Sequence, residues 1–160
     1  APVALQIGEL IEETDRIMAP LAAARGITID RRLAADLPVI HADRRALKQV
    51  VINLISNAVK FTPEKGRITI RVAGGGAPGG IEITIADSGS GIAPEHLPHV
   101  TEPFYRAGDA YTTGPASGAG LGLSIAHGLL KAHGGSLDIA SHPGRGTTVT
   151  LRFPPMPPAA

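Results

Sequence analysis

Two asparagines and a lysine recur at helical spacing in the middle of the chain. Asn53, Asn57 and Lys60 occupy positions i, i+4 and i+7, so in a helix they share one face. Amide oxygens are hard ligands that suit Mg²⁺, and an ammonium group can neutralise a phosphate as a point charge. The spacing is compatible with a site for a divalent cation and a phosphate, although three polar residues beside an apolar stripe are also typical of a solvated helix flank.

An aspartate followed by two glycines ends an alternating segment further along the chain. The residues are Asp87-Ser88-Gly89-Ser90-Gly91-Ile92. The ordinary interpretation is a tight turn after a strand. The functional interpretation is a carboxylate at the floor of a pocket, which accepts hydrogen bonds and would select an exocyclic amine such as that of adenine. The glycines would then let a flat ligand approach the backbone closely.

A third motif, Gly118-Ala119-Gly120-Leu121-Gly122-Leu123, opens a segment with helical spacing. Free backbone N–H groups and the positive end of the helix dipole meet at a helix N-terminus, which suits a phosphate. The spacing G-x-G-x-G is not the G-x-G-x-x-G of a dinucleotide-binding fold, and no strand precedes it. A P-loop is excluded because the chain lacks the glycine-lysine-serine or glycine-lysine-threonine of that motif.

The helices that would carry these motifs can be predicted from apolar spacing. They cover about 5–25, 43–60 and 119–133. In the second helix, Asp43 is the expected N-cap, and Thr62-Pro63 is the expected end. The apolar stripe of that helix consists of Leu47, Val50, Val51, Leu54, Ile55 and Ala58.

Alternating patterns predict strands over 27–33, 68–72, 81–85, 137–140 and 147–153, with another short one at 39–40. Two of them, 68–72 and 81–85, flank a glycine-rich loop and should pair antiparallel. Residues 87–118 are rich in Gly, Pro, Ser and Thr without a sustained period, which is typical of a functional lid or a disordered segment. The proline-rich residues 154–160 cannot pair in a sheet.

Composition narrows the classes of function. The chain has 160 residues, the size of one domain, and its hydrophobic content of 43% is that of a globular protein. A net charge of +1 gives no reason to expect a nucleic-acid binder, and the absence of cysteine excludes disulfides, thiolate metal sites and a cysteine nucleophile. The chain begins without Met, its first residues lack the basic flank and long apolar run typical of a signal peptide, and no apolar run in it is long enough for a bilayer. We interpret it as a piece of a larger protein.

Taken in order, these motifs resemble those of the catalytic, ATP-binding domain of two-component sensor histidine kinases, in the GHKL ATPase superfamily. The resemblance covers about residues 5–153. The stretch Asn53–Phe61 resembles the N box, Asp87–Ile92 the first glycine box, Glu102–Arg106 the F box, Gly118–Leu123 the second glycine box and Gly144–Thr147 the closing motif. Such motifs in order at the family spacing are far more specific than any one glycine motif.

The resemblance implies an α/β fold of the Bergerat type. This is a two-layer sandwich in which a mixed sheet of about five strands packs on three helices, with a mobile ATP lid. Residues 1–15 would be the end of a linker from an upstream dimerisation and phosphoacceptor domain, residues 16–153 the catalytic domain and residues 154–160 a disordered tail. We expect a cytoplasmic domain, monomeric as a fragment of a homodimeric kinase, whether or not the parent is anchored in a membrane.

The resemblance also assigns roles to side chains. Asn57 would be the principal Mg²⁺ ligand with help from Asn53, and Lys60 would contact phosphate. Asp87 would bind the adenine amine directly and through water, in a network that Thr147 joins.

The glycine boxes and the lid would complete the nucleotide site. The adenine side would be lined by Gly89, Gly91 and Ile92, and the phosphate side by Gly118, Gly120, Leu121, Gly122 and Leu123. Residues 93–117 would be the lid, with Phe104 anchoring its hinge and Arg106 as the nearest cation for the γ-phosphate.

The implied function is that of the catalytic fragment of a protein-histidine kinase. It would bind ATP and Mg²⁺ and transfer the γ-phosphate to a His on the absent phosphoacceptor domain, from which it passes to an Asp of a response regulator. None of the six histidines is followed by Asp or Glu, so the acceptor is expected upstream and little activity is expected from the fragment alone; the histidines are His41, His96, His99, His127, His133 and His142.

Departures from the family pattern keep other interpretations open. Thr101 stands where the family usually has Phe, and residues 110–117 of the lid contain no Lys or Arg. Both would fit a degenerate kinase-like module that signals by protein contact without phosphotransfer. A hydrolytic ATPase is disfavoured, because hydrolytic members of the superfamily carry Glu where this chain has Asn53, and a neutral amide cannot act as a general base for water.

Overall fold

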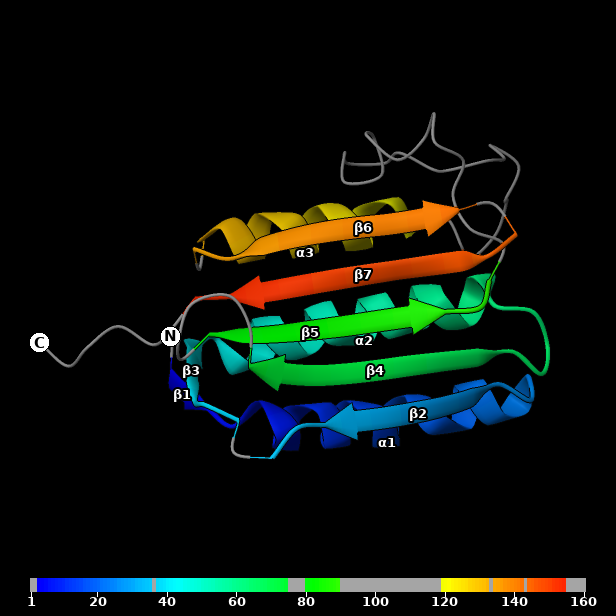
Figure 1. The fold of residues 1–160 in the computed structure, drawn as a ribbon, viewed down its shortest axis with the longest axis horizontal. Helices are drawn as coiled ribbons and strands as arrows, with labels where there is room; N and C mark the ends of the chain where they lie inside the picture. Colours follow the sequence, from blue (N-terminus) through cyan, green and yellow to red (C-terminus); the bar gives the residue numbers. More distant parts are fainter. Residues whose placement is uncertain are drawn as a thin grey trace, which may run out of the picture.

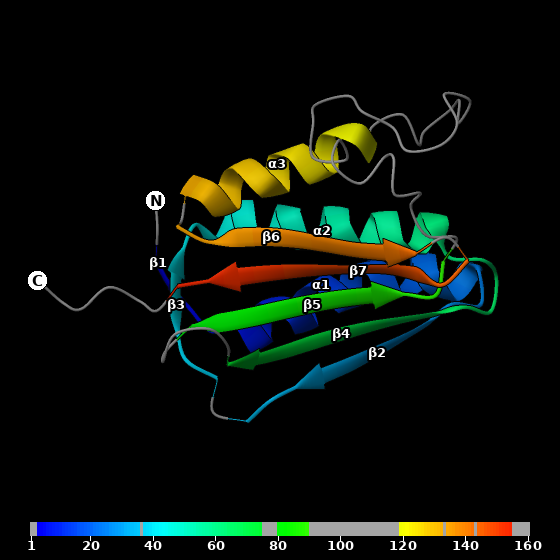
Figure 2. The ribbon, with the colours of Figure 1, turned by 45° about the horizontal axis from the view of Figure 1, so that its top comes forward.

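A five-stranded sheet, covered on one face by three helices, forms the framework of the domain (Figures 1 and 2). The computed structural model describes residues 3–35, 37–74, 80–89, 119–132, 134–142 and 144–154. The helices are α1 (Ile7–Ala24), α2 (Arg44–Phe61) and α3 (Ala119–Ala132). The strands of the large sheet are β2 (Thr28–Leu33), β4 (Arg67–Gly74), β5 (Ile81–Asp87), β6 (Ser136–His142) and β7 (Gly146–Phe153). The predicted two-layer α/β fold is confirmed.

The sheet is mixed, with the strand order β2-β4-β5-β7-β6. β2 pairs parallel to β4, and the other neighbouring strands pair antiparallel, including the predicted pair β4 and β5. The register places Asp87 at the end of β5 opposite Thr147 on β7. The last strand in sequence therefore lies inside the sheet, between β5 and β6.

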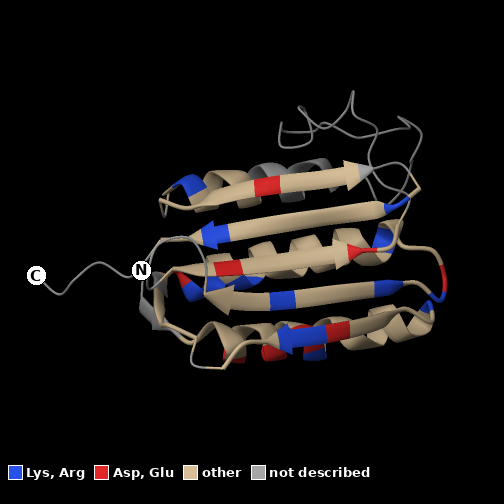
Figure 3. Ribbon diagram, viewed as in Figure 1, with Lys and Arg blue, Asp and Glu red and all other residues tan. Residues whose placement is uncertain are grey.

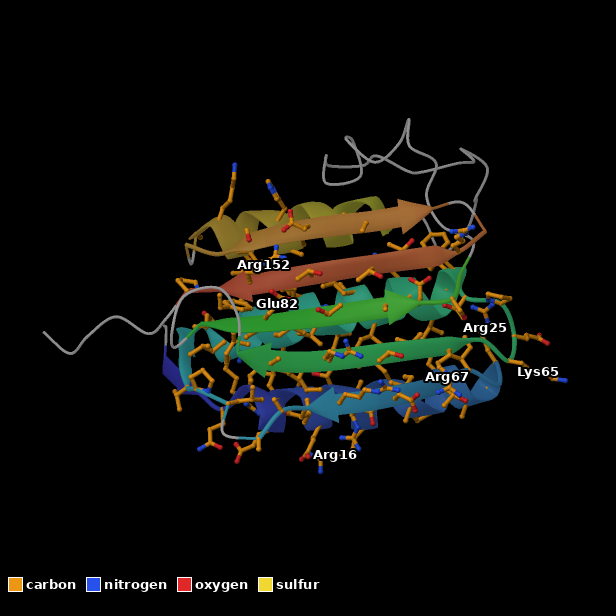
Figure 4. The ribbon with its side chains drawn as sticks, viewed as in Figure 1. Arg16, Arg25, Lys65, Arg67, Glu82 and Arg152 are labelled. Atoms are coloured by element: carbon orange, nitrogen blue, oxygen red, sulfur yellow. The ribbon has the colours of Figure 1, made fainter. Side chains whose placement is uncertain are left out.

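Alternation along the strands separates a face packed on the helices from an open face. Ile68, Ile70 and Val72 of β4 are buried, while Arg67 and Arg71, at alternate positions of the same strand, are exposed. The open face carries charges of both signs (Figure 3), some of them in cross-strand pairs. Arg67 bonds to Asp30 of β2, and Arg152 of β7 bonds to Glu82 of β5 and Asp138 of β6; Figure 4 labels Arg67, Glu82 and Arg152.

Helix α2 lies at the centre of the helical layer and contacts α1, α3 and β5. All six residues of its predicted apolar stripe are buried. Asp43 caps its N-terminus as predicted, because the Asp43 carboxylate accepts a hydrogen bond of 3.1 Å from the Ala46 N–H. At the other end, both the backbone N–H and the hydroxyl of Thr62 donate to the Ala58 carbonyl. These caps define the helix that carries Asn53, Asn57 and Lys60.

Helix α1 includes the position where the sequence analysis divided linker from domain. Ile7, Leu10 and Ile11 in its first turns are buried in the core, and residue 16 lies within the same helix. The division at residue 15 stays a prediction. None of the helices among the described residues is long and apolar enough to span a bilayer.

The sequence patterns did not predict a second, two-stranded sheet. It pairs β1 (Val3–Leu5) antiparallel with β3 (Ile40–Ala42), where only a short strand at 39–40 was predicted. Strands of three residues are too short for a period of two to stand out in the sequence.

Candidate functional site

The candidate site is centred on Asp87, at the C-terminal end of strand β5. Its Oδ1 atom accepts hydrogen bonds from the Gly89 N–H at 2.8 Å and from the Thr147 N–H at 3.3 Å. The first bond closes the turn that follows the strand, and the second crosses to β7. Within the described part of the chain no hydrogen bond reaches Oδ2. One carboxylate oxygen is thus fixed by the backbone, and the other is available to a ligand.

Asp87 belongs to a polar row that crosses three strands. Residues directly opposite each other in a ladder point to the same face of a sheet. Asp87 is opposite Ile68 and Thr147, and Thr147 is opposite Ser141. Ile68 is fully buried, so this row faces the helical layer. We call Asp87, Thr147 and Ser141 the polar row; it forms the floor of the site.

Burial raises the pKa of the Asp87 carboxyl above its ordinary value, while the hydrogen bonds from Gly89 and Thr147 act in the opposite direction. Removal from water disfavours the charged form, so the carboxylate gains more from a ligand N–H than an exposed one would. The raised pKa of Asp87 and its unbonded Oδ2 atom indicate the same chemistry. The Asp87 carboxylate is suited to accept a hydrogen bond from a neutral donor.

Two glycines make this arrangement possible. A Cβ at Gly89 would lie 2.5 Å from the Phe61 carbonyl oxygen and 2.7 Å from Asp87 Oδ1. Gly146 has a φ of +94°, and a Cβ there would overlap the Asp87 carbonyl oxygen. Gly89 was predicted to line the site. Gly146 was noticed only as part of the closing motif, and its position just before Thr147 is the signal that could have assigned it.

The polar flank of α2 supplies the opposite side of the site. Asn53, Asn57 and Lys60 are half-buried, and the close approach of Gly89 to Phe61 places the C-terminal turn of α2 against the Asp87 turn. Asn53 Oδ1 accepts a hydrogen bond of 2.9 Å from Gln49 Nε2. Two amide oxygens and an ammonium fit a magnesium-bound phosphate, since Mg²⁺ takes few protein ligands and completes its shell with phosphate and water.

The start of α3 lies toward the same end of the sheet as the ends of α2 and β5 (Figures 1 and 2). Residues 120–123 occupy its first turns, as predicted. The first N–H groups of a helix have no partner within it, so they can meet an anion. The described residues thus bring together, at one end of the sheet, the carboxylate, the amide flank and a helix N-terminus.

Several predicted site residues lie outside the described residues. They are Gly91, Ile92, Phe104, Arg106 and Gly118, together with residues 93–117 assigned to the lid. Thr101 and residues 110–117, where the sequence departs from the family pattern, lie outside them as well.

One residue that supports the site was not predicted. Arg25, at the end of α1, donates through Nη1 to the carbonyls of Val59 and Lys60, the latter at 3.2 Å. These belong to the last four carbonyls of α2, which lack partners within the helix. Figure 4 shows Arg25 at the same end of the molecule as Lys65. An arginine before Gly26 carries no pattern that would reveal this contact from sequence.

Comparison with known proteins agrees with this geometry. Residues 42–157 match the model of the family described as histidine kinase-, DNA gyrase B-, and HSP90-like ATPase. The chain belongs to this family. The match spans α2, the polar row and α3, so it covers the part of the chain that carries all the motifs described above.

Relatives within the family are sensor kinases. The chain is 40% identical over 146 residues to the histidine protein kinase DivJ of Caulobacter vibrioides, covering 91% of this chain and 24% of that protein. It resembles the catalytic domain of histidine kinase ThkA with a TM-score of 0.83 and 25% identity, covering 98% of this chain and 97% of that one. Full-length ShkA in complex with AMPPNP gives a TM-score of 0.83 and 31% identity, covering 100% of this chain and 32% of that one.

The chain therefore spans about a quarter of the length of DivJ and about a third of ShkA. The predicted resemblance to the catalytic domain of sensor histidine kinases is confirmed, because ThkA's catalytic domain matches over almost its whole length.

Proposed function

We propose that this chain is the ATP-binding catalytic domain of a sensor histidine kinase and that it binds ATP together with Mg²⁺. The observation that carries the proposal is the Asp87 carboxylate, which is fixed through Oδ1 and left with an unbonded Oδ2 within the described part of the chain. Membership of the family supports it, as does the similarity to ShkA, whose structure is a complex with the nucleotide analogue AMPPNP.

In this proposal Asp87 Oδ2 accepts the exocyclic amine of adenine, and Thr147 joins the water network beside it. The close packing of Gly89 on Phe61 keeps side chains away from the base. Gly91 and Ile92 line the same side. An acceptor that is held in place before the ligand arrives loses little entropy on binding, which favours affinity.

The triphosphate would lie between the polar flank of α2 and the start of α3. Asn57, with Asn53, would hold Mg²⁺, and Lys60 would contact a phosphate oxygen. The bound Mg²⁺ would neutralise charge on the phosphates. The backbone of Gly118, Gly120, Leu121, Gly122 and Leu123 would donate to them. Residues 93–117 would close over the nucleotide, with Phe104 at the hinge and Arg106 toward the γ-phosphate.

The γ-phosphate would pass to a His on a phosphoacceptor domain upstream of this chain, and from there to an Asp of a response regulator. Phosphoryl transfer depends mainly on positioning and charge stabilisation, which this site can supply. Asn53 is a neutral amide that accepts from Gln49, so it cannot deprotonate water. That chemistry favours keeping ATP intact for a protein nucleophile over hydrolysing it.

Substitution of Asp87 by Asn tests the site without changing its shape. The Gly89 and Thr147 N–H groups require an acceptor at Oδ1, so they fix the amide orientation and put the NH₂ group in the place of Oδ2. A donor then faces the adenine amine. Loss of a hydrogen bond to a charged group costs about 1.5–3 kcal/mol, so we expect Mg-ADP affinity to fall by about 10- to 150-fold in calorimetry.

Asp138→Asn is the matched control, because Asp138 lies on the open face and bonds to Arg152. It should bind Mg-ADP as the parent chain does. Equal affinity of Asp87→Asn and the parent chain would contradict the adenine assignment. Transfer of labelled phosphate to the parent protein's own acceptor domain, added in trans, tests the kinase step. Nucleotide binding without transfer would favour the protein-contact module.

A further inference from the structure

One side chain ties the end of helix α2, which carries Lys60, to the end of helix α1. The half-buried Arg25 follows the last residue of α1 and donates through Nη1 to the Val59 carbonyl and, at 3.2 Å, to the Lys60 carbonyl. The Arg25 carbonyl in turn accepts a hydrogen bond of 3.3 Å from the Lys65 N–H (Figure 4). Arg25 thus joins the end of α1, the last turn of α2 and the loop that follows α2.

The last turn of α2 depends on such outside contacts. Carbonyls in the last turn of a helix lack N–H partners within the helix, so this turn frays unless other groups bind them. The Ala58 carbonyl is bound by Thr62 of the same helix end, and the next two carbonyls are those that Arg25 binds. Because Arg25 comes from another helix, its bonds hold this turn in place relative to the rest of the domain.

The position of this turn matters for the phosphate side of the site and not for the base side. A lysine side chain is a flexible four-carbon stem, so the place of its ammonium group depends on where its backbone is held. Lys60 therefore needs a fixed backbone to meet a phosphate. The Asp87 carboxylate is held by the N–H groups of Gly89 and Thr147, which belong to the sheet and its following turn and not to α2.

We propose that Arg25 is a positioning residue for phosphate binding, acting through the last turn of α2 and the ammonium group of Lys60. Arg25 precedes residues 42–157, which match the family model, so that match does not assign it a role. The inference rests on the proposed nucleotide-binding function and adds a residue to it. Arg25 should matter for binding a nucleotide and not for binding the nucleoside that lacks the phosphates.

The test compares Mg-ADP with adenosine, which carries the same base and sugar without phosphate, on this chain. Calorimetry measures the affinity for Mg-ADP, and an NMR titration measures the weaker affinity for adenosine. A hydrogen bond to a charged group changes affinity by about 10- to 150-fold, and a displaced Lys60 keeps part of that gain. In Arg25→Met we expect Mg-ADP affinity to fall by about 5- to 20-fold while adenosine affinity stays unchanged.

Arg16→Met is the matched control, because it removes the same charge from an exposed position of α1. It should leave both affinities unchanged. Arg25→Lys keeps a cation that can still donate to the end of α2, so its loss of Mg-ADP affinity should be smaller and again absent for adenosine. This variant tests the inference even if Arg25→Met does not fold. Equal losses for the two ligands, as a purely structural role would give, or an unchanged Mg-ADP affinity would overturn the inference.

Lys60→Met tests the route from Arg25 to the phosphates. It should weaken Mg-ADP and leave adenosine unchanged. In the Lys60→Met background, Arg25→Met should then have no further effect on Mg-ADP affinity, because both changes remove the same contact. A further fall in the double variant would mean that Arg25 acts on the phosphates by another route, and the inference would be wrong.

Failure of this inference is distinguishable from failure of the proposed function. If the parent chain does not bind Mg-ADP, both fall. If it binds Mg-ADP and that binding weakens in Asp87→Asn and in Lys60→Met but not in Arg25→Met, only the role of Arg25 falls.

Discussion

Replacement of Gly146 by Ala should damage both the fold and the nucleotide site. Gly146 has a φ of +94°, which L residues rarely adopt, and a Cβ there would overlap the Asp87 carbonyl oxygen and lie 3.0 Å from the Asp87 carbonyl carbon. The start of β7 must therefore move away from β5. That movement breaks the 3.3 Å bond from the Thr147 N–H to Asp87 and disturbs the 3.1 Å bond from Ser141 to the Gly146 carbonyl.

The chain offers a matched control in Gly144, two residues earlier in the same turn. Gly144 has a φ of +79°, but a Cβ there would meet nothing within 4 Å. Gly144→Ala should cost only the backbone strain, about 1–2 kcal/mol. Gly146→Ala has a similar strain and also loses two hydrogen bonds, each contributing about 1 kcal/mol. It should therefore be less stable than Gly144→Ala by about 2 kcal/mol.

Thermal unfolding without nucleotide measures this difference. For a domain of this size 1 kcal/mol corresponds to about 2–4 °C, so the Tm of Gly146→Ala should lie about 4–8 °C below that of Gly144→Ala. Mg-ADP affinity should fall in Gly146→Ala and stay unchanged in Gly144→Ala. Equal Tm values for the two variants would refute the reasoning, because the close approach to Asp87 would then carry no cost.

Two further predictions follow from contacts at the same end of the sheet. Arg25→Met removes two hydrogen bonds to the end of α2 and should lower stability by about 2 kcal/mol, or roughly 4–8 °C in Tm; Arg25→Lys should recover part of the loss, and Arg16→Met on the exposed side of α1 should cause none. A Tm unchanged in Arg25→Met would contradict the capping role. The raised pKa of Asp87 predicts opposite pH trends for stability and binding. Between the ordinary value of 3.8 and the raised pKa the folded chain binds more protons than the unfolded one, so stability falls as pH rises, whereas Mg-ADP affinity rises as the carboxylate ionises. In Asp87→Asn, the pH dependence of the Tm and the pH dependence of Mg-ADP affinity in calorimetry should both disappear. If both quantities changed with pH in that variant as they do in the parent chain, another group would be responsible.

The sequence predicts best the elements whose signals are local. Helix α2 was predicted at 43–60 and runs over Arg44–Phe61, because its apolar stripe, its Asp43 cap and Thr62-Pro63 all agree. Strand β5 extends beyond the predicted 81–85 to Asp87, since pairing with β4 and β7 continues past the alternating apolar residues. The three helices and the antiparallel pairing of β4 with β5 could thus be predicted from the apolar spacing and the alternating pattern of the sequence alone.

The supporting contacts of the site could not be predicted in this way. Ser141, Gly146 and Arg25 act through partners that are distant in sequence or set by strand register, and register appears only once the sheet is formed. The assignments to Asn53, Asn57, Lys60 and Asp87 came from the resemblance; their roles stay predictions until nucleotide binding is measured.

The position of β7 has a consequence for how this protein is made. The Thr147 N–H that fixes Asp87 comes from a residue 60 positions later in the chain. During synthesis, β5 leaves the ribosome long before its neighbour β7. Until β7 has emerged, one edge of β5 is unpaired and the Asp87 carboxylate lacks its hydrogen bond from β7. Since non-local strand pairing forms slowly, the Asp87 turn should be completed only when the domain's last strand has emerged. A nascent or truncated chain that lacks β7 cannot hold Asp87 as the full domain does, so capture on an immobilised nucleotide would separate completed chains from unfinished ones.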